Sequence, residues 1–227
     1  MNKNSDSISE KVECIDTQNT PTTLIATTGF HCLVWRSTRI ISYDGRKSLV
    51  DVVIKRHREP CFFRETVILN RDYEELKDRL GSMVPNALFV TTEIAGVETV
   101  IVVAEAVTPW FNIANPSNEE EAVPLLRKLP SARKQLCRFI EVARSWRQGN
   151  SGKTIDLYGI DNLVLDVNRT IKFLDSFRVF FYDDLLHVID EVDDALTSKI
   201  EISRQRLEYI DYLVKESRIA RIPRLSF

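Results

Sequence analysis

The sequence is poor in the residues that mark several classes of site. It has only three histidines and four cysteines in 227 residues. The cysteines are widely scattered and show no CxxC or Cys/His spacing, which argues against a zinc site and predicts reduced thiols in a cytoplasmic protein. None of the histidines stands beside a serine or cysteine in a nucleophile motif, so a hydrolase triad has little support.

A surplus of positive charge and long apolar runs are also missing. The formal net charge is -2, which gives no case for a nucleic-acid partner. The longest apolar run, 97–107, is interrupted by Glu98 and Glu105, so no membrane span is expected. Residues 1–20 are polar and lack the apolar core of a secretion signal, and we expect them to form a disordered lead-in.

The first half of the chain carries strand patterns. Residues 22–41 are rich in β-branched and aromatic side chains and predict two strands. A third strand is expected over 48–56. Between them the segment 43–46 contains Asp-Gly, a pair that favours the positive φ angles of tight hairpins. The segment therefore predicts a hairpin turn.

A helix and two more strands are expected next. Apolar residues recur at helical spacing over 62–80, and Gly81 ends that helix in the usual C-terminal way. The following segments, 87–94 and 98–107, read as strands joined at Ala95-Gly96. The first half of the chain thus predicts five strands and one helix.

The second half is mainly helical in pattern. Residues 109–118 are rich in Pro, Asn and Ser and form the best boundary between two lobes. Helices are expected over 119–129 and 131–148, the second with one apolar face. The segment 182–219 is almost continuously helical in pattern and reads as one or two amphipathic helices.

The most informative stretch, between these helices, runs from Asp156 to Phe177. Two short apolar runs, 163–165 and 171–174, are joined by Asp-Val-Asn-Arg-Thr and predict a β-hairpin. This hairpin would hold Asn162 and Asp175 side by side at the strand ends. Oxygen ligands of this kind suit Mg²⁺, which is usually held by few protein groups plus substrate phosphates. The arrangement predicts a phosphotransfer site.

This stretch resembles the catalytic loop and metal-binding Asp of the protein-kinase-like superfamily. The resemblance implies a bilobal α+β fold. Its N-lobe, five strands plus one helix, would span 21–108, its hinge or linker 109–118, and its reduced helical C-lobe 119–227. ATP and Mg²⁺ are the implied cofactors, with Asp156 as the catalytic base and with Asn162 and Asp175 as the metal ligands.

Further implied roles fall on the first half of the chain. Lys55 closes the run VVIK, which is similar to the VAIK motif whose Lys contacts the α- and β-phosphates. Asp72 stands where the family has the Glu that pairs with this Lys, and Glu75 and Glu65 are alternatives. By position, the backbone from Glu105 to Val107 would contact the adenine edge.

The chain also departs from the family pattern. Asp156 precedes Asn162 by six residues where the family has five, and Asp161 is an alternative acid. The family's DFG is Asp175-Ser176-Phe177 here. The phosphate-binding loop, 26–31, has a single Gly, so phosphate would be held mainly by Lys55 and metal. About fifty residues follow Asp175, and they contain no recognisable peptide-binding segment.

Three interpretations follow from these residues. The first is an ATP- and Mg²⁺-dependent phosphotransferase whose acceptor is a hydroxyl on a protein or small molecule. The second is a pseudokinase, a regulatory module that binds nucleotide or a partner, with 182–219 as the docking element. The third is an α+β domain with an unrelated role, in which the motifs match by chance.

Overall fold

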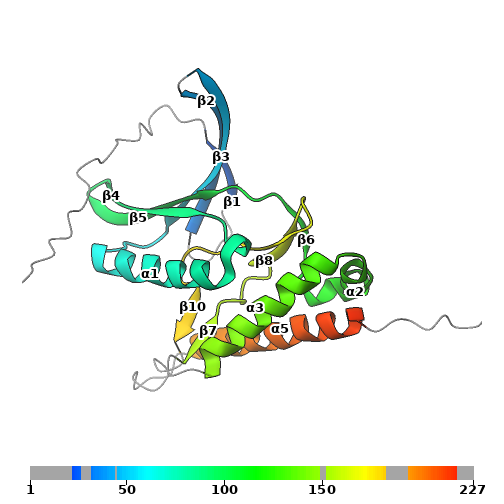
Figure 1. Ribbon diagram of the computed structural model, residues 1–227. Helices are drawn as coiled ribbons and strands as arrows, with labels where there is room; N and C mark the ends of the chain where they lie inside the picture. Colours follow the sequence, from blue (N-terminus) through cyan, green and yellow to red (C-terminus); the bar gives the residue numbers. More distant parts are fainter. Residues whose placement is uncertain (1–21, 27–31, 44, 149–151, 183–193, 219–227) are drawn as a thin grey trace, which may run out of the picture.

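A computed structural model describes residues 22–26, 32–43, 45–148, 152–182 and 194–218. A five-stranded antiparallel sheet lies on one side of the molecule (Figure 1). On the other side lie the helices α2 (Glu119–Lys128), α3 (Pro130–Gln148) and α5 (Asp194–Arg218). Helix α1 (Phe63–Leu80) runs between them. The molecule is therefore a mixed α+β protein, as the sequence predicts. The expected lead-in, 1–20, and most of the expected phosphate-binding loop, 27–31, lie outside the described residues.

The large sheet contains the five strands expected from the first half of the chain. Their bounds are β1 (Thr23–Ala26), β2 (Cys32–Tyr43), β3 (Arg46–His57), β4 (Ala87–Ile94) and β5 (Val97–Glu105). The strand order is β1-β2-β3-β5-β4. In the turn between β2 and β3, Gly45 has φ 74°, the left-handed conformation that glycine adopts without strain. The predicted hairpin turn is confirmed.

The register of β3 decides which of its side chains face the lower part of the molecule. Lys55 is opposite Val34 of β2 and Val102 of β5. Side chains alternate between the two faces of a strand, so Leu49, Asp51 and Val53 share the face of Lys55. Lys55 is buried although it is charged, and a buried ammonium must find hydrogen-bond acceptors.

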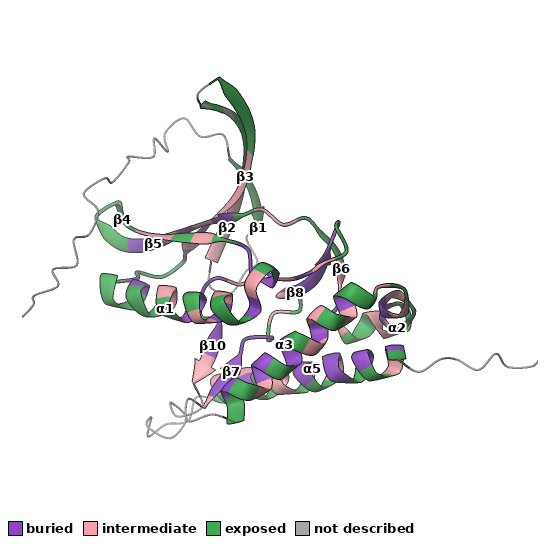
Figure 2. Cartoon of the chain, viewed as in Figure 1, coloured by how far each residue is buried: buried purple, intermediate pink, exposed green. Residues whose placement is uncertain are grey.

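Helix α1 (Phe63–Leu80) packs mainly on the lower part of the molecule. Its Glu65 carboxylate accepts a hydrogen bond from the Phe62 N–H at 2.8 Å, which caps the first turn. Its buried face, with Tyr73, Leu76 and Leu80, joins a core shared with α2, α3 and α5. Figure 2 shows buried residues on α1, α3 and α5, interspersed with exposed ones. A short 3₁₀ turn, η1 (Gly81–Met83), follows.

The lower part combines helices with two small sheets. The elements are β6 (Pro109–Asn112), η2 (Pro116–Asn118), α2 (Glu119–Lys128), α3 (Pro130–Gln148), β7 (Lys153–Ile155), β8 (Leu163–Asp166), β9 (Ile171–Phe173), β10 (Phe180–Tyr182) and α5 (Asp194–Arg218). The predicted hairpin is confirmed as β8 and β9. The strands β6, β7 and β10 were not predicted, because segments of three or four residues are too short to show a periodicity.

The expected linker, 109–118, is not a simple connector. Its first residues form β6, which pairs with β8 in the three-stranded sheet β6-β8-β9. Ladder hydrogen bonds thus make the first four residues of the expected linker part of the lower sheet. Of the helical segment predicted over 182–219, helix α5 covers 194–218, and 183–193 lie outside the described residues. No described helix is long and apolar enough to cross a membrane.

A second, smaller core lies against the large sheet. It consists of Cys61, Val100, Val102, Ala104 and Phe177. The Phe177 ring makes edge-to-face contacts with His57 at 5.6 Å and with Phe89 at 6.2 Å between centroids. Phe177 follows Asp175 by two residues. Packing of Phe177 against the upper sheet therefore holds the backbone in place directly after Asp175, the predicted metal ligand.

Candidate functional site

Three polar side chains converge where the short strands of the lower part end. Asp156 follows β7, Asn162 precedes β8, and Asp175 lies two residues beyond β9. The Leu174 N–H donates to the Asn162 carbonyl at 2.8 Å, which continues the β8–β9 hairpin to its end. The Asn162 Nδ2 donates to the Asp156 carbonyl oxygen at 3.2 Å. The hairpin and the loop together assemble the residues that the sequence predicted as base and metal ligands.

Asp156 is a buried acid in an unfavourable electrostatic environment. Its side chain is only 5% exposed. Burial, and next the charge of nearby Asp175, raises the pKa of Asp156 from 3.8 to about 7. The Tyr158 N–H, which donates to Asp156 Oδ1 at 2.8 Å, and the charges of Lys199 and Arg206 act in the opposite direction. A carboxyl group with a pKa near neutrality can take up and release a proton at physiological pH.

This environment predicts that Asp156 reduces the stability of the folded protein. Between pH 4 and 7 the folded state keeps a proton that the unfolded state has lost, so stability falls as the pH rises. We expect Asp156→Asn to be more stable than wild type in metal-free buffer, and more so at pH 8 than at pH 5. The shift sets an upper limit of about 4 kcal/mol at pH 8.

Chemical denaturation at both pH values, with a chelator present, measures this effect. Asp161→Asn is the matched control, since Asp161 is exposed, and its stability should stay close to wild type. A variant Asp156→Asn that is less stable than wild type at pH 8 would show that the carboxylate has a structural role.

Asp175 and Asn162 present oxygen atoms that suit a hard cation. Asp175 Oδ1 accepts the N–H groups of Ser176 at 2.7 Å and of Phe177 at 3.1 Å, which fixes the carboxylate. Among the described residues none donates to its Oδ2. Because Asn162 Nδ2 is used by Asp156, the oxygen Oδ1 of Asn162 is the atom left for a ligand.

These donors fit Mg²⁺ better than a transition metal. The described residues contain no group of three or more His, Cys, Asp or Glu side chains placed to hold a metal. Zinc sites need three or four such ligands. Mg²⁺ instead keeps several waters and is bound by one or two protein oxygens together with substrate phosphates. Asn162 and Asp175 match this second pattern.

Lys55 reaches the same place from the upper sheet. Its Nζ donates to the Leu174 carbonyl at 2.6 Å and to Ser176 Oγ at 3.2 Å. These two residues flank Asp175, so the ammonium group lies beside the predicted metal ligand. Ser176, which departs from the family triplet, is itself buried and serves as the partner of Lys55. The predicted phosphate-contacting lysine and the predicted metal ligand are therefore brought together.

The expected ion pair of Lys55 is not formed. Asp72 accepts hydrogen bonds from the Tyr182 hydroxyl at 2.5 Å and from Arg71 Nη2 at 3.0 Å. The two alternatives are also engaged elsewhere, since Glu75 pairs with Lys153 at 2.6 Å and Glu65 caps its own helix. This corrects the prediction for Asp72 within the described part of the chain. The physical reason is that α1 is docked on the lower core, where Asp72 meets Tyr182 of β10 and Glu75 meets Lys153 of β7.

The segment Glu105 to Val107 has fewer free backbone N–H groups for a ligand than expected. The Glu105 N–H donates to the Asn86 carbonyl at 2.9 Å, and the Ala106 N–H donates to the Asp51 carbonyl at 3.1 Å. The Glu105 carboxylate is also held by Asn86. No hydrogen bond between described residues uses the Val107 N–H. Of the three N–H groups in this segment, that of Val107 is therefore the one left for an adenine edge.

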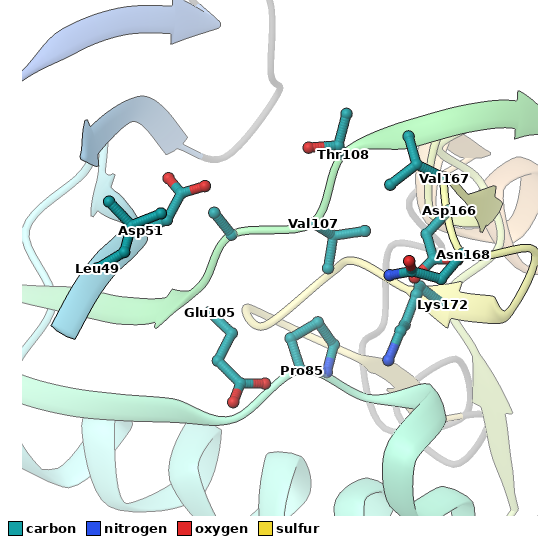
Figure 3. Close-up of a pocket in the computed structure, with 11 residues that line it drawn as sticks. Leu49, Asp51, Pro85, Glu105, Val107, Thr108, Asp166, Val167, Asn168 and Lys172 are labelled. Atoms are coloured by element: carbon teal, nitrogen blue, oxygen red, sulfur yellow. The ribbon is translucent and has the colours of Figure 1, made fainter. Parts of the chain in front are cut away.

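A hollow of about 390 Å³ adjoins this segment, and Figure 3 shows the side chains around it. Leu49 and Asp51 of β3 lie on one side, and the β8–β9 turn lies on the other. The remaining lining residues are Pro85, Glu105, Ala106, Val107, Thr108, Asp166, Val167, Asn168 and Lys172. Lys55, Asp156 and Asp175 are not among the residues that line it.

The alternative acid, Asp161, belongs to a different local structure. Its Oδ1 accepts a hydrogen bond from Asn112 Nδ2 of β6 at 2.7 Å, and its side chain is exposed. Asp156, in contrast, is buried and close enough to Asp175 for their charges to interact. The geometry therefore favours Asp156 over Asp161 as the acid or base of this site.

Helix α5 braces the loop that carries Asp156, a role that the sequence did not reveal. The Leu157 N–H donates to Ser203 Oγ at 3.1 Å, and Arg206 Nη1 donates to the Leu157 carbonyl at 2.6 Å and to the Tyr158 carbonyl. Lys199 lies over the Tyr158 ring at 5.7 Å. The sequence contained one signal of this role, because Ser203 is a polar residue on the apolar face of the predicted helix. A single serine, however, does not indicate which group it binds.

Cys32 is a second residue that sequence reasoning missed. It is the first residue of β2, its thiol is half-buried, and it lies close enough to Lys55 and Asp175 for their charges to act on it. Burial is the largest effect and raises the pKa of the thiol. Cys32 thus places a neutral, weakly polar thiol at one side of the site.

No protein-family model matches the chain, and no curated protein is significantly similar to it.

Proposed function

We propose that the chain is an ATP- and Mg²⁺-dependent phosphotransferase with a kinase-like arrangement, which transfers the γ-phosphate to a hydroxyl group. The observation that carries the proposal is the convergence of Lys55, Asp156, Asn162 and Asp175 on one place. These residues come from opposite sides of the molecule and are separated by up to 120 residues in the sequence. A cation, two metal-ligand oxygens and a carboxylate of raised pKa are the groups that phosphoryl transfer requires.

Each residue has a distinct task in this proposal. Asn162 and Asp175 hold Mg²⁺, which when bound neutralises phosphate charge. Lys55 binds the α- and β-phosphates. Asp156 orients the acceptor hydroxyl and takes its proton as the new oxygen–phosphorus bond forms and the bond between γ-phosphorus and ADP breaks. The backbone of Val107 contacts the adenine edge. Positioning of this kind can suffice, because the protein needs to supply little covalent chemistry.

One observation favours a second candidate, a pseudokinase that binds nucleotide or a partner without transfer. Lys55 has no carboxylate partner among the described residues, and its ammonium group is already satisfied by the Leu174 carbonyl and Ser176. Binding of phosphate would have to compete with these two hydrogen bonds. The two candidates differ in phosphate transfer. Transfer by the wild type that is lost in a variant of Asp156 would support the first candidate, and a wild type that transfers no phosphate would support the second.

A thermal-shift titration with ATP, with and without Mg²⁺, tests nucleotide binding. Ligand linkage predicts a rise in melting temperature for wild type that depends on Mg²⁺. Lys55→Met should lose most of this rise, because its ammonium contacts the phosphates. Lys47→Met, in the exposed distal part of the same strand, is the matched control and should behave as wild type. Equal behaviour of the two variants would remove Lys55 from the site.

A further inference from the structure

One glycine of the Asp156–Asn162 loop has no conformational reason to be glycine. Gly45, Gly81, Gly96 and Gly152 have positive φ angles, where other residues are strained. Gly159 is the only described glycine outside this set. Its φ is not in the left-handed range, so the effect of a side chain at this position depends on the space around it.

The space at Gly159 is filled by the side chain of Asn162. A Cβ atom built on Gly159 would lie 2.6 Å from Asn162 Oδ1, 2.9 Å from Cγ and 3.1 Å from Nδ2. The close approach arises because Gly159 and Asn162 are the ends of a β-turn, in which the Asn162 N–H donates to the Gly159 carbonyl at 3.1 Å. The amide group of Asn162 thus folds back over Gly159.

A hydrogen bond to Asp156 sets the orientation of this amide. Asn162 Nδ2 donates to the Asp156 carbonyl, which leaves Oδ1 as the free oxygen. A methyl group at position 159 would overlap with Oδ1 and Cγ, and the side chain would have to rotate away. Such a rotation would break the bond to Asp156 and move the oxygen that is proposed to bind Mg²⁺.

We propose that Gly159 is a positioning residue for the Mg²⁺ ligand Asn162. The inference rests on the proposed function for the identity of the ion, and on the geometry of the turn for the role of the glycine. The loop contains one residue more between Asp156 and Asn162 than the family pattern. In this longer loop, Gly159 allows the side-chain amide of Asn162 to reach the Asp156 carbonyl, because only a residue without a side chain leaves room for the amide.

The experiment compares Mg²⁺ dependence in four proteins: wild type, Gly159→Ala, Asn162→Ala and the double variant. The melting temperature is followed as MgCl₂ is titrated at fixed ATP, and binding of MnCl₂ in the presence of ATP is measured by electron paramagnetic resonance. Gly159→Ala should need about 10- to 100-fold more metal for half-saturation, as for groups that orient a metal ligand. The double variant should equal Asn162→Ala, because the clash disappears with the amide.

A control separates positioning from general destabilisation. Gly96→Ala introduces strain at φ 79° in the β4–β5 turn with nothing within 4 Å. It should lower the melting temperature without changing the metal concentration at half-saturation. The unliganded protein gives a further readout: the NMR signal of the Asn162 side-chain amide should shift in Gly159→Ala and stay unchanged in Gly96→Ala.

Two results would overturn the inference. In the first, Gly159→Ala binds metal as wild type does while Asn162→Ala does not, which leaves the proposed function in place. In the second, the effects of Gly159→Ala and Asn162→Ala add in the double variant, which would show that the glycine acts independently of the amide. If the proposed function itself is wrong, the melting temperatures of all four proteins, including the wild type, would not respond to Mg²⁺.

Discussion

Asp156→Asn is expected to lose phosphoryl transfer while it keeps Mg²⁺-ATP binding. The substitution preserves shape and an oxygen that can accept the Tyr158 N–H, but it removes the group that takes the proton of the acceptor. A general base supplies about 10²- to 10⁴-fold in rate, so the loss should be easy to measure. Transfer is measured with labelled ATP as autophosphorylation, as transfer to a lysate and as release of phosphate to water.

The control for this prediction is Asp161→Asn, which changes an acid in the same loop that is bonded to Asn112. It should retain transfer. If Asp161→Asn loses transfer and Asp156→Asn keeps it, the catalytic role belongs to Asp161. If wild type binds ATP and transfers no phosphate in any assay, the pseudokinase candidate is supported. Together with the expected gain in stability, loss of transfer in Asp156→Asn would identify a carboxylate kept for function at the expense of stability.

Asp175→Asn is expected to abolish the Mg²⁺-dependent part of ATP binding with little effect on the unliganded fold. An asparagine keeps Oδ1, which can still accept the N–H groups of Ser176 and Phe177. It replaces Oδ2 by an NH₂ group, which repels a cation. At a ligand concentration 100 times Kd, binding stabilises a protein by about 2.7 kcal/mol, and the variant should lack the metal-dependent share of this gain.

Thermal shift with ATP alone and with Mg²⁺-ATP measures this difference. Asp166→Asn is a useful comparison, because Asp166 also accepts a backbone N–H in this hairpin, that of Thr170 at 2.8 Å, but at the opposite end of β8. Its Mg²⁺ response should remain. An unfolded Asp175→Asn together with a wild type that ignores Mg²⁺-ATP would make Asp175 a structural residue and end the kinase-like proposal.

The elements that the sequence predicted well are those with local causes. Helix α1 was expected over 62–80 and spans Phe63–Leu80, because its apolar residues repeat along one face and Gly81 stops it. The β8–β9 hairpin was expected because two apolar runs flank a turn. The spacing of Asn162 and Asp175 then follows from the hairpin itself, since both residues lie at its open end.

Features that depend on packing between distant segments were not predictable in this way. Lys55 and Leu174 are separated by 119 residues, and their hydrogen bond depends on how the upper sheet approaches the lower part. The predicted ion pair of Lys55 and Asp72 is not formed for the same reason. The pattern of α1 shows a polar face, but it does not show that Tyr182 lies beside that face and donates a hydrogen bond to the Asp72 carboxylate.

The sequence by itself determined the five strands of the large sheet, the main helices, the position of the hairpin and the choice of oxygen-bearing residues at its end. These follow from hydrophobic periodicity and turn residues, which act over a few positions along the chain. Only the tertiary structure decided that Asp156 is buried beside Asp175, that α5 braces its loop, and that Asn86 and Asp51 occupy the N–H groups of Glu105 and Ala106. Burial, charge proximity and competition for backbone hydrogen bonds are properties of neighbours in space, and these neighbours come from remote parts of the chain.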